Sequence, residues 1–312
     1  MKIRLLSTMT LVLGLLMLAA CASAPAKANL SNTSSQISSN SLPKTGLDRV
    51  AVVRAYVSKE NTGDFQKTLA FYADDAVVDA PVGLFIGKQE IAMFLEKDVK
   101  TTRATPEKTY VDGPFVIDTG TVSLARFIQA GIGPTSYRTE YIIDNAGKIR
   151  FFTPATLLTP EQEVKWKAVL AKTGQPAAQA VNPIDVAKAY VQTANSGDFE
   201  KSLAYYADDS AALVQNGSLL LVGKQQIANW LQTDVLTTRA APQDWQIQGN
   251  MVINTGTVSL ARFKSLGIGS VQYRAIYIIQ DGKIRFFRPI PILTPEQQEK
   301  IQSAQVTSSP AH

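Results

Sequence analysis

The feature that most constrains the fold of this chain is an internal repeat that spans most of its 312 residues. The nine residues from Thr119 to Phe127 recur without change at 255–263. Other matching pairs lie at offsets of 134 to 136 residues: Ala55-Tyr56-Val57 with 189–191, Gly63-Asp64-Phe65 with 197–199, Tyr72–Asp75 with 206–209, Lys148–Phe152 with 283–287, and Leu158–Gln162 with 293–297. This offset is the length of a domain and far exceeds the period of a solenoid. The sequence therefore predicts two tandem copies of one domain.

Each copy shows a helical pattern first and strand patterns afterwards. In copy one, apolar residues from Val50 to Val57 share one helical face, Gly63 ends that helix, and Asp64 caps a second helix that runs to about Ala73. Short extended pieces are expected near 77–79 and 84–86, a helix over about 88–100, strands near 109–117, 120–129, 135–144 and 148–153, and a further helix over 160–172. Helices that precede antiparallel strands indicate an α+β fold.

The order of these motifs resembles the NTF2-like superfamily, and within it the SnoaL-like domains. The resemblance rests on Gly63-Asp64-Phe65, Tyr72–Asp75, Gly87-Lys88 before a helix, and the closing Asp144-x-x-Gly-Lys-Ile149, and it covers about 46–158 and 182–293. It implies two tandem cones, each with N-terminal helices packed on a curved antiparallel sheet that leaves a pocket. The superfamily includes isomerases, cyclases, hydrolases, dehydratases and non-enzymatic binding modules, so the fold does not decide the function.

The N-terminus has the pattern of a bacterial lipoprotein signal peptide. Residues 1–20 join a basic start to an apolar run too short to span a membrane, and Leu18–Cys21 resembles a lipobox. The resemblance implies that Cys21 carries lipid and anchors the chain to the bacterial cell envelope. Ala22, where an Asp would favour the inner membrane, predicts the outer membrane if the cell has two. The alternative is an ordinary signal peptide with an incidental Cys.

The predicted domain organisation follows from the repeat and the composition between its copies. It comprises the signal peptide at 1–20, lipidated Cys21 with a Ser/Asn/Ala-rich tether over 21–45, domain one over 46–158, a helix and linker over 159–181, domain two over 182–293, and a helix and tail over 294–312. Cys21 and His312 are the only residues of their types, so the sequence excludes internal disulfides, Ser-His-Asp triads and His-based metal sites. No cofactor or metal is predicted, and the spread-out net charge of +5 does not indicate nucleic acid.

Two arginines are the first candidates for ligand binding. Alternation along the predicted strand 120–129 places Val122, Leu124 and Arg126 on the apolar face, and Arg262 is the equivalent in copy two. An inward guanidinium needs an acidic or carbonyl-bearing partner. The alternative is an arginine near a strand end that reaches solvent or forms a structural ion pair.

Asp79, between Val77-Val78 and Ala80-Pro81, is the candidate catalytic residue. The resemblance implies that acid–base residues can lie near this strand at the pocket mouth, where a desolvated carboxylate could act as a general base. Copy two has no carboxylate at the corresponding place, so either only copy one is active or Asp79 is a solvated strand-end residue. The further ligand-binding candidates are tyrosines that would donate hydrogen bonds to a ligand oxygen, or else fill the core: Tyr56, Tyr141, Tyr190 and Tyr277.

Two other charged groups fit structural roles. Asp74-Asp75 and its copy at 208–209 are expected at a solvated helix end, because further metal ligands at a suitable spacing are missing. Arg138 and Glu140 alternate with Tyr137 and Tyr141 and are expected on an outer sheet face. Such a face would allow the two domains to pair with each other within one chain.

Three functional hypotheses follow. The leading one is a membrane-anchored envelope lipoprotein whose pockets bind a small apolar or acidic molecule, or a protein partner, without catalysis. The second is a SnoaL-like acid–base isomerase or hydrolase that uses Asp79. The third is a structural spacer whose cones are filled by their own side chains. Copy two keeps the Arg and Tyr positions but lacks the Asp79 carboxylate, which favours recognition over proton transfer.

Overall fold

The computed structural model describes residues 46–172 and 181–307. The predicted signal peptide, Cys21 and the tether lie outside the described residues. Within the described part, no helix is long and apolar enough to cross a membrane.

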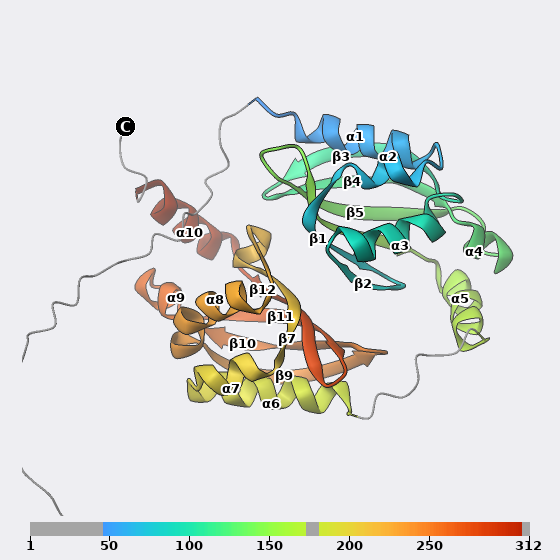
Figure 1. Cartoon of the computed structure of the whole chain (residues 1–312). Helices are drawn as coiled ribbons and strands as arrows, with labels where there is room; N and C mark the ends of the chain where they lie inside the picture. Colours follow the sequence, from blue (N-terminus) through green and yellow to red (C-terminus); the bar gives the residue numbers. More distant parts are fainter. Residues whose placement is uncertain (1–45, 173–180, 308–312) are drawn as a thin grey trace, which may run out of the picture. The chain divides into compact units, whose positions relative to one another are not determined.

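The first cone is a six-stranded sheet with helices on one face (Figure 1). Its strand order is β2-β1-β6-β5-β4-β3. Its elements are α1 (Arg49–Glu60), α2 (Phe65–Leu69), β1 (Tyr72–Ala80), β2 (Gly83–Ile86), α3 (Lys88–Asp98), β3 (Arg103–Asp112), β4 (Phe115–Ser123), α4 (Ala125–Gln129), β5 (Thr135–Ile143), β6 (Ile149–Leu157) and α5 (Pro160–Lys172).

The second cone repeats this architecture, with strand order β8-β7-β12-β11-β10-β9. Its elements are α6 (Pro183–Ser196), α7 (Phe199–Ala204), β7 (Tyr206–Val214), the 3-10 turn η1 (Gln215–Gly217), β8 (Leu219–Val222), α8 (Lys224–Thr237), β9 (Arg239–Gln248), β10 (Met251–Ser259), α9 (Ala261–Ser265), β11 (Ser270–Gln280), β12 (Lys283–Ile292) and α10 (Pro295–Thr307). The α+β class and the two curved sheets agree with the fold expected from the sequence.

Local chemistry fixes where the helices begin and how they attach to the sheet. The Asp64 carboxylate accepts a hydrogen bond from the Lys67 backbone N–H and so caps α2, as predicted. At the end of α1, the Asn61 side chain bridges to β3: its Nδ2 donates to the Ala104 carbonyl at 2.7 Å, and its Oδ1 accepts from the Ala104 N–H at 2.7 Å. Asn195 makes the same bridge to Ala240 in the second cone. These amides tie the first helix of each cone to an edge strand.

Three local expectations were wrong. The residues Tyr72–Asp75 begin strand β1 instead of ending a helix, because α2 stops at Leu69. Strand β1 pairs in parallel with β6, so the sheet is not purely antiparallel. The strand expected over 120–129 ends at Ser123, and the chain turns into α4, whose Phe127 packs on Val122 and Leu124.

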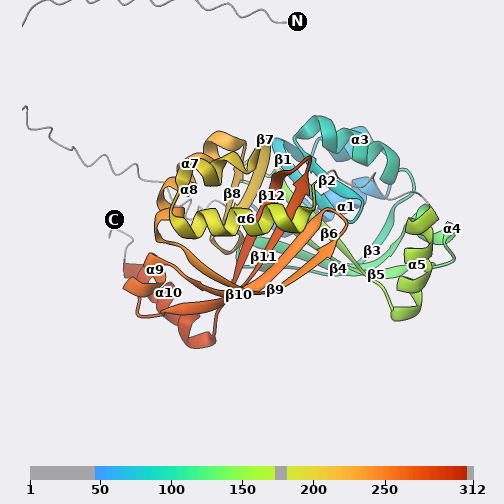
Figure 2. The ribbon, with the colours of Figure 1, turned by 90° about the horizontal axis from the view of Figure 1, so that it is seen from below.

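The core of each cone lies between the helices and the sheet. In the first cone, Ala76, Val78 and Ala80 of β1 join Tyr56, Ile91 and other buried residues in this core. Figure 2 shows α4 and α5 at the same end of the first sheet, and the Phe127 and Trp166 rings of these helices meet edge to face at 4.9 Å. Helix α10 takes the corresponding place in the second cone, where Ile301 packs against the cluster of Leu260, Phe263 and Val271.

A third apolar cluster lies on the sheet faces turned away from the helices, and it contains residues of both cones. Phe151 of β6 and its repeat equivalent Phe286 of β12 stack with centroids 6.0 Å apart and planes at 12°. Val77, Leu213, Leu220 and Ile278 are also buried in this cluster. Beside it, Arg288 donates to Glu140 at 2.9 Å. The outer face expected for Arg138 and Glu140 is thus in contact with residues of the second cone.

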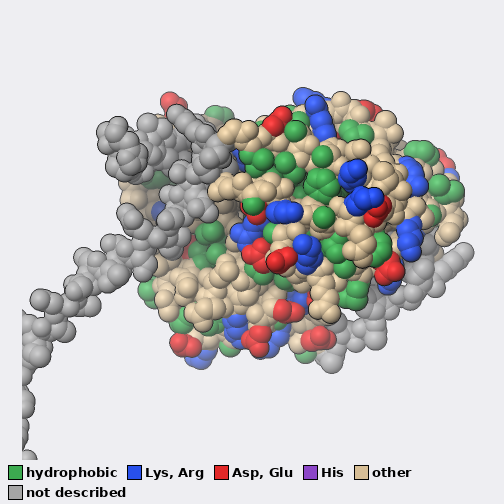
Figure 3. Space-filling view, turned by 45° about the horizontal axis from the view of Figure 1, so that its top comes forward, with side chains coloured by type: hydrophobic (Ala, Val, Ile, Leu, Met, Phe, Trp, Pro, Cys, Tyr) green, Lys and Arg blue, Asp and Glu red, His purple; other side chains and the backbone are tan. Residues whose placement is uncertain are grey.

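The exposed surface carries charges of both signs. Figure 3 shows Lys and Arg side chains interspersed with Asp and Glu on the face turned to the reader. Several surface charges pair locally, such as Lys67 with Asp64 and Lys201 with Asp198.

Candidate ligand-binding cavities

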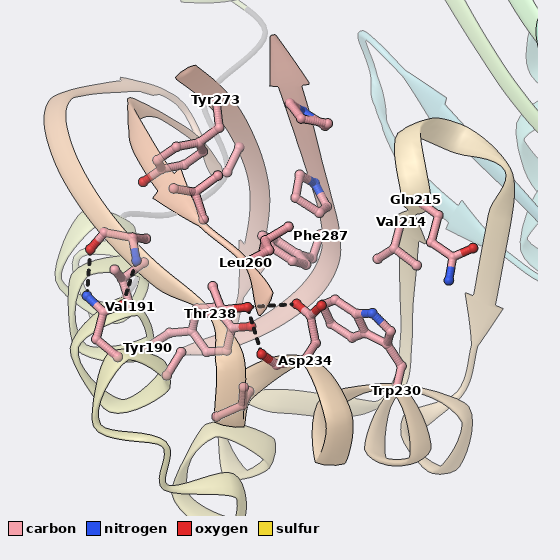
Figure 4. A pocket seen from close by; sticks show the side chains of 18 of the residues that line it. Tyr190, Val191, Val214, Gln215, Trp230, Asp234, Thr238, Leu260, Tyr273 and Phe287 are labelled. Carbon is pink, nitrogen blue, oxygen red and sulfur yellow. Dashed lines mark hydrogen bonds between the residues drawn. The ribbon is translucent and has the colours of Figure 1, made fainter. Parts of the chain in front are cut away.

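A cavity of about 800 Å³, its open mouth included, lies in the second cone between helices α6 and α8 and the sheet (Figure 4). Most of its wall is apolar. It is lined by Tyr190, Val191, Ala194, Asn195, Val214, Gln215, Asn216, Trp230, Asp234, Val235, Thr238, Ala240, Val258, Leu260, Arg262, Tyr273, Ala275, Tyr277, Phe287, Pro289 and Pro291. A largely apolar concavity with a few polar groups is the usual form of a small-molecule site.

One carboxylate and one guanidinium face this cavity in the second cone. Trp230 and Asp234 lie one helical turn apart on α8, and Thr238 at the end of that helix donates to Asp234 Oδ2 at 3.1 Å (Figure 4). Burial raises the pKa of Asp234, while the charge of Arg262 and the Thr238 hydrogen bond oppose that shift. Arg262 therefore has a carboxylate near it, which offsets its positive charge in the cavity.

The turn between β7 and β8 brings two amide side chains to the second cavity. Gln215 and Asn216 both have left-handed backbone conformations, with φ of 52° and 56°, and Gly217 follows at 86°. A Cβ at Gly217 would lie 2.2 Å from the Phe115 ring, which would have to shift, and the positive φ of Gly217 is itself one that side chains rarely adopt. Consecutive left-handed residues other than glycine are strained and concentrate at functional sites. The first cone has the shorter turn Pro81-Val82 here.

The first cone holds a cavity of about 640 Å³, its open mouth included. It is lined by Val57, Glu60, Ala80, Pro81, Phe94, Thr102, Ala104, Asp118, Val122, Leu124, Arg126, Tyr137, Thr139, Tyr141, Phe152, Pro154, Ala155 and Thr156. Its polar centre is Asp118 on β4, which is 1% exposed. Tyr137 donates to Asp118 Oδ2 at 2.5 Å, and Thr109 donates to Asp118 Oδ1 at 2.7 Å.

The protonation of this pair follows from its surroundings. Burial raises the pKa of Asp118, against the hydrogen bonds from Tyr137 and Thr109 and the charge of Arg54. Burial and the adjacent Asp118 carboxyl also raise the pKa of Tyr137, so this phenol stays protonated and remains a hydrogen-bond donor. The arrangement holds a carboxyl group at the cavity wall and leaves room for a ligand beside it.

The candidate arginines reach their cavities from unexpected elements. Arg126 and Arg262 are both among the residues that line the cavities, but they lie on helices α4 and α9 and not on the strands from which their placement was expected. Arg126 lies over the Phe127 and Trp166 rings, with centroids 5.8 and 5.9 Å away.

The candidate tyrosines divide into two groups. Tyr141, Tyr190 and Tyr277 line the cavities, whereas Tyr56 is fully buried behind the wall. The hydroxyls of Tyr56 and Tyr72 lie 3.0 Å apart, as do those of Tyr190 and Tyr206. Burial raises the pKa of the Tyr56 and Tyr141 hydroxyls well above the ordinary value. The ring of Tyr56 packs against those of Phe71 and Tyr141, which fits the alternative expectation that these tyrosines fill the core.

Asp79 lies on the face of β1 that is turned away from the cavity. Its neighbours Val78 and Ala80 belong to the core beneath the helices, and alternation sends Asp79 with Val77 to the other face. Burial raises the pKa of Asp79 to about 6, against the charge of Arg288. The candidate general base is therefore not among the residues that line either cavity.

The sequence analysis missed Asp118, Glu60, Trp230 and Asp234. The same alternation that places Val122 inward also places Asp118 inward, four residues earlier on β4, so the signal was present. Asp234 is harder to predict from the sequence, because polar and apolar residues alternate irregularly around it on the helix. Among the described residues no group of three or more His, Cys, Asp or Glu is arranged to hold a metal ion. Asp74 pairs with Lys88, and Asp75 receives a hydrogen bond from Arg150 Nε at 3.2 Å.

Comparisons with known proteins give one family match and several similar solved structures. Residues 53–150 match the family model of the SnoaL-like domain. Among solved structures, an NTF2-like protein of unknown function from Cytophaga hutchinsonii aligns with 39% of this chain and 99% of its own, at 15% identity and a TM-score of 0.32. A putative polyketide cyclase from Sinorhizobium meliloti covers 34% of this chain and 94% of its own, at 19% identity and a TM-score of 0.30.

One further solved structure is similar over a smaller share of its own length. The Orange Carotenoid Protein of Anabaena (Nostoc), solved with canthaxanthin bound, aligns over 36% of this chain and 37% of its own, at 20% identity and a TM-score of 0.30. No curated protein matches the chain. Residues 53–150 are therefore similar to the SnoaL-like domain, and they lie within the first of two tandem six-stranded cones of the same architecture.

Proposed function

We propose that this protein is a membrane-anchored envelope lipoprotein whose cones bind a small, mainly apolar molecule without transforming it. The observation that carries the proposal is a concavity with a mostly apolar wall that both cones retain between the helices and the sheet. A spacer filled by its own side chains would be expected to lose such cavities, because unfilled space in a core is destabilising.

The polar groups of the cavities support recognition in preference to catalysis. In each cone an arginine and two or three tyrosines line a mostly apolar wall. The acid–base alternative relied on Asp79, whose side chain lies on the opposite face of the sheet from the cavity core. A few polar groups on an apolar wall orient a ligand and select it by its polar atoms.

Membrane attachment is the second part of the proposal, and its support is the sequence of residues 1–21. The Cys21→Ala variant should move from the membrane fraction to the aqueous fraction of the producing bacterium, because two or more acyl chains hold a protein on a bilayer far more firmly than none. Intact mass of the native protein should exceed that of the polypeptide from Cys21 onward by the mass of the lipid.

The anchor would be ruled out if the native protein and Cys21→Ala divided equally between the membrane and aqueous fractions. An unmodified Cys21 in the membrane-bound protein would rule it out as well. The Ser23→Ala variant is a suitable control, because it changes the same segment without touching the cysteine.

A contact quencher tests the cavity itself. Bromooctanol is uncharged and mainly apolar, and its bromine quenches an indole only at close contact. Trp230 lines the second cavity, whereas Trp166 and Trp245 do not. Titration of the full-length protein should give saturable quenching that is lost in Trp230→Phe and kept in Trp245→Phe. Linear, non-saturable quenching that is equal in all three proteins would contradict binding in this cavity.

A further inference from the structure

The two cavities share a frame but differ in charge. The first cavity is lined by two carboxylates, Glu60 and Asp118, whose repeat equivalents in the second cone are the uncharged residues Ala194 and Asn254. The other described charges on the walls are Arg126 in the first cavity, and Asp234 with Arg262 in the second. Among the lining residues that the structure describes, carboxylates outnumber guanidinium groups in the first cavity and equal them in the second.

The negative charge of Asp118 is not needed to build the fold. In the second cone, Tyr273 donates to Asn254 Oδ1 as Tyr137 donates to Asp118 in the first. The strands β4 and β10 that carry these residues have the same register with their neighbours. A neutral amide therefore does the same structural work at this position.

The charge is also costly where it lies. Asp118 is 1% exposed, and its hydrogen-bond donors are the hydroxyls of Tyr137 and Thr109. Its pKa is raised by burial despite those bonds and the charge of Arg54. Asp118 thus lies at a cavity wall, where burial disfavours its charge and where the fold accepts an amide instead. A carboxyl group kept under these conditions points to a ligand that binds to it.

A second carboxylate lies on the same wall. Glu60, at the end of α1, accepts a hydrogen bond from Tyr56 at 3.3 Å, and it lines the same cavity as Asp118. Two carboxylates above an apolar floor match a ligand with a positively charged head and an apolar body, because an ammonium group donates three hydrogen bonds and neutralises the charge.

We propose that the first cavity binds a protonated amine with an apolar body, whereas the second cavity binds an uncharged molecule. The inference rests on the proposed function and names the ligand class of one of its two cavities. The ammonium group contacts Asp118 and Glu60, and the apolar body lies along Val122, Phe94 and Phe152.

Calorimetric titration of the full-length protein with octylamine and with octanol tests this difference. The native protein should bind octylamine at a site that Asp118→Asn weakens about tenfold or more, the expected size for a lost charged hydrogen bond. Octanol binding should change by less than about twofold. Because Asn254 already occupies the matching position, Asp118→Asn should fold, and circular dichroism checks this. Glu60→Gln is the second variant, with a smaller loss expected at its less buried position.

Asp112→Asn, on the exposed strand β3 outside both cavities, is the matched control and should leave octylamine binding unchanged. Equal octylamine affinity in the native protein, Asp118→Asn and Glu60→Gln would overturn the amine assignment while octanol binding still supported the cavities. Failure of both probes to bind would instead contradict the proposed function itself.

Discussion

Replacing Gly120 by alanine should lower the free energy of unfolding by about 3 kcal/mol, as expected for forced overpacking against backbone. A Cβ at this position would lie 2.1 Å from the Thr105 carbonyl oxygen and 3.0 Å from the Glu107 nitrogen. These are backbone atoms of a β-bulge, where the register of β3 against β4 shifts between Pro106 and Lys108. Neither β3 nor β4 can move away from the added methyl group without breaking hydrogen bonds between the strands.

The repeat supplies an independent test of the same cause. Gly256 lies at the equivalent bulge of the second cone, with its Cβ position 2.3 Å from the Ala241 carbonyl oxygen. Gly256→Ala should therefore destabilise the protein to a similar extent. Gly46→Ala is the control, because no atom lies within 4 Å of that Cβ. Chemical denaturation measures the free energy of unfolding of all three variants. A decrease below about 1 kcal/mol for both Gly120→Ala and Gly256→Ala would contradict this explanation.

The bulge also matters to the cavity. Gly120 lies between Asp118 and Val122 on β4, and both of these residues line the first cavity. A shift of β4 would move the Asp118 carboxyl relative to Tyr137. Gly120→Ala should therefore weaken octylamine binding under conditions where the protein is still folded.

Stability should fall as pH rises through about 6, because of Asp79. Burial raises the pKa of Asp79 to about 6 against the charge of Arg288, from an ordinary value of 3.8. The native state thus holds the proton more tightly than the unfolded chain. The stabilisation from this group is fully present below about pH 4 and is lost as pH rises through about 6. The shift corresponds to about 2–3 kcal/mol.

The Asp79→Asn variant isolates this contribution from other titrating groups. Between about pH 4 and pH 8, its free energy of unfolding should rise relative to that of the native protein by about 2 kcal/mol, since an amide does not ionise. Asp74→Asn is the control, because Asp74 is an exposed carboxyl on the same strand. A difference between Asp79→Asn and native protein that does not change with pH would show that Asp79 ionises normally.

Much of the fold could be predicted from the sequence because the repeat and the turn residues are local signals. The caps at Asp64 and Asp198 and the helix over Pro160–Lys172 follow from nearby residues. The parallel pairing of β1 with β6 joins residues about 75 positions apart, and no local pattern encodes it. Tyr72 already pairs with Ile149 of β6, so the helix expected to run to about Ala73 was wrong.

Strand alternation accounts for Val122 at the cavity wall, but it does not account for Arg126, because β4 ends at Ser123 and Arg126 lies on helix α4. Arg126 lines the cavity although its strand ends early, because α4 turns the same residues toward the same space. Asp79 was placed at the mouth by its position after Val77-Val78, whereas strict alternation sends it outward. Asp118 shares a face with Val122 and could have been found by the same rule.

Native mass spectrometry of the full-length protein, purified gently from its native source, tests the central claim most directly. The account predicts a small molecule that stays bound in the native spectrum and leaves on denaturation. The fraction of protein that carries it should be lower in Arg262→Ala and Asp118→Asn, which alter the cavity walls. Protein free of any small molecule from every preparation, together with no uptake of octanol or octylamine when these are added, would contradict it.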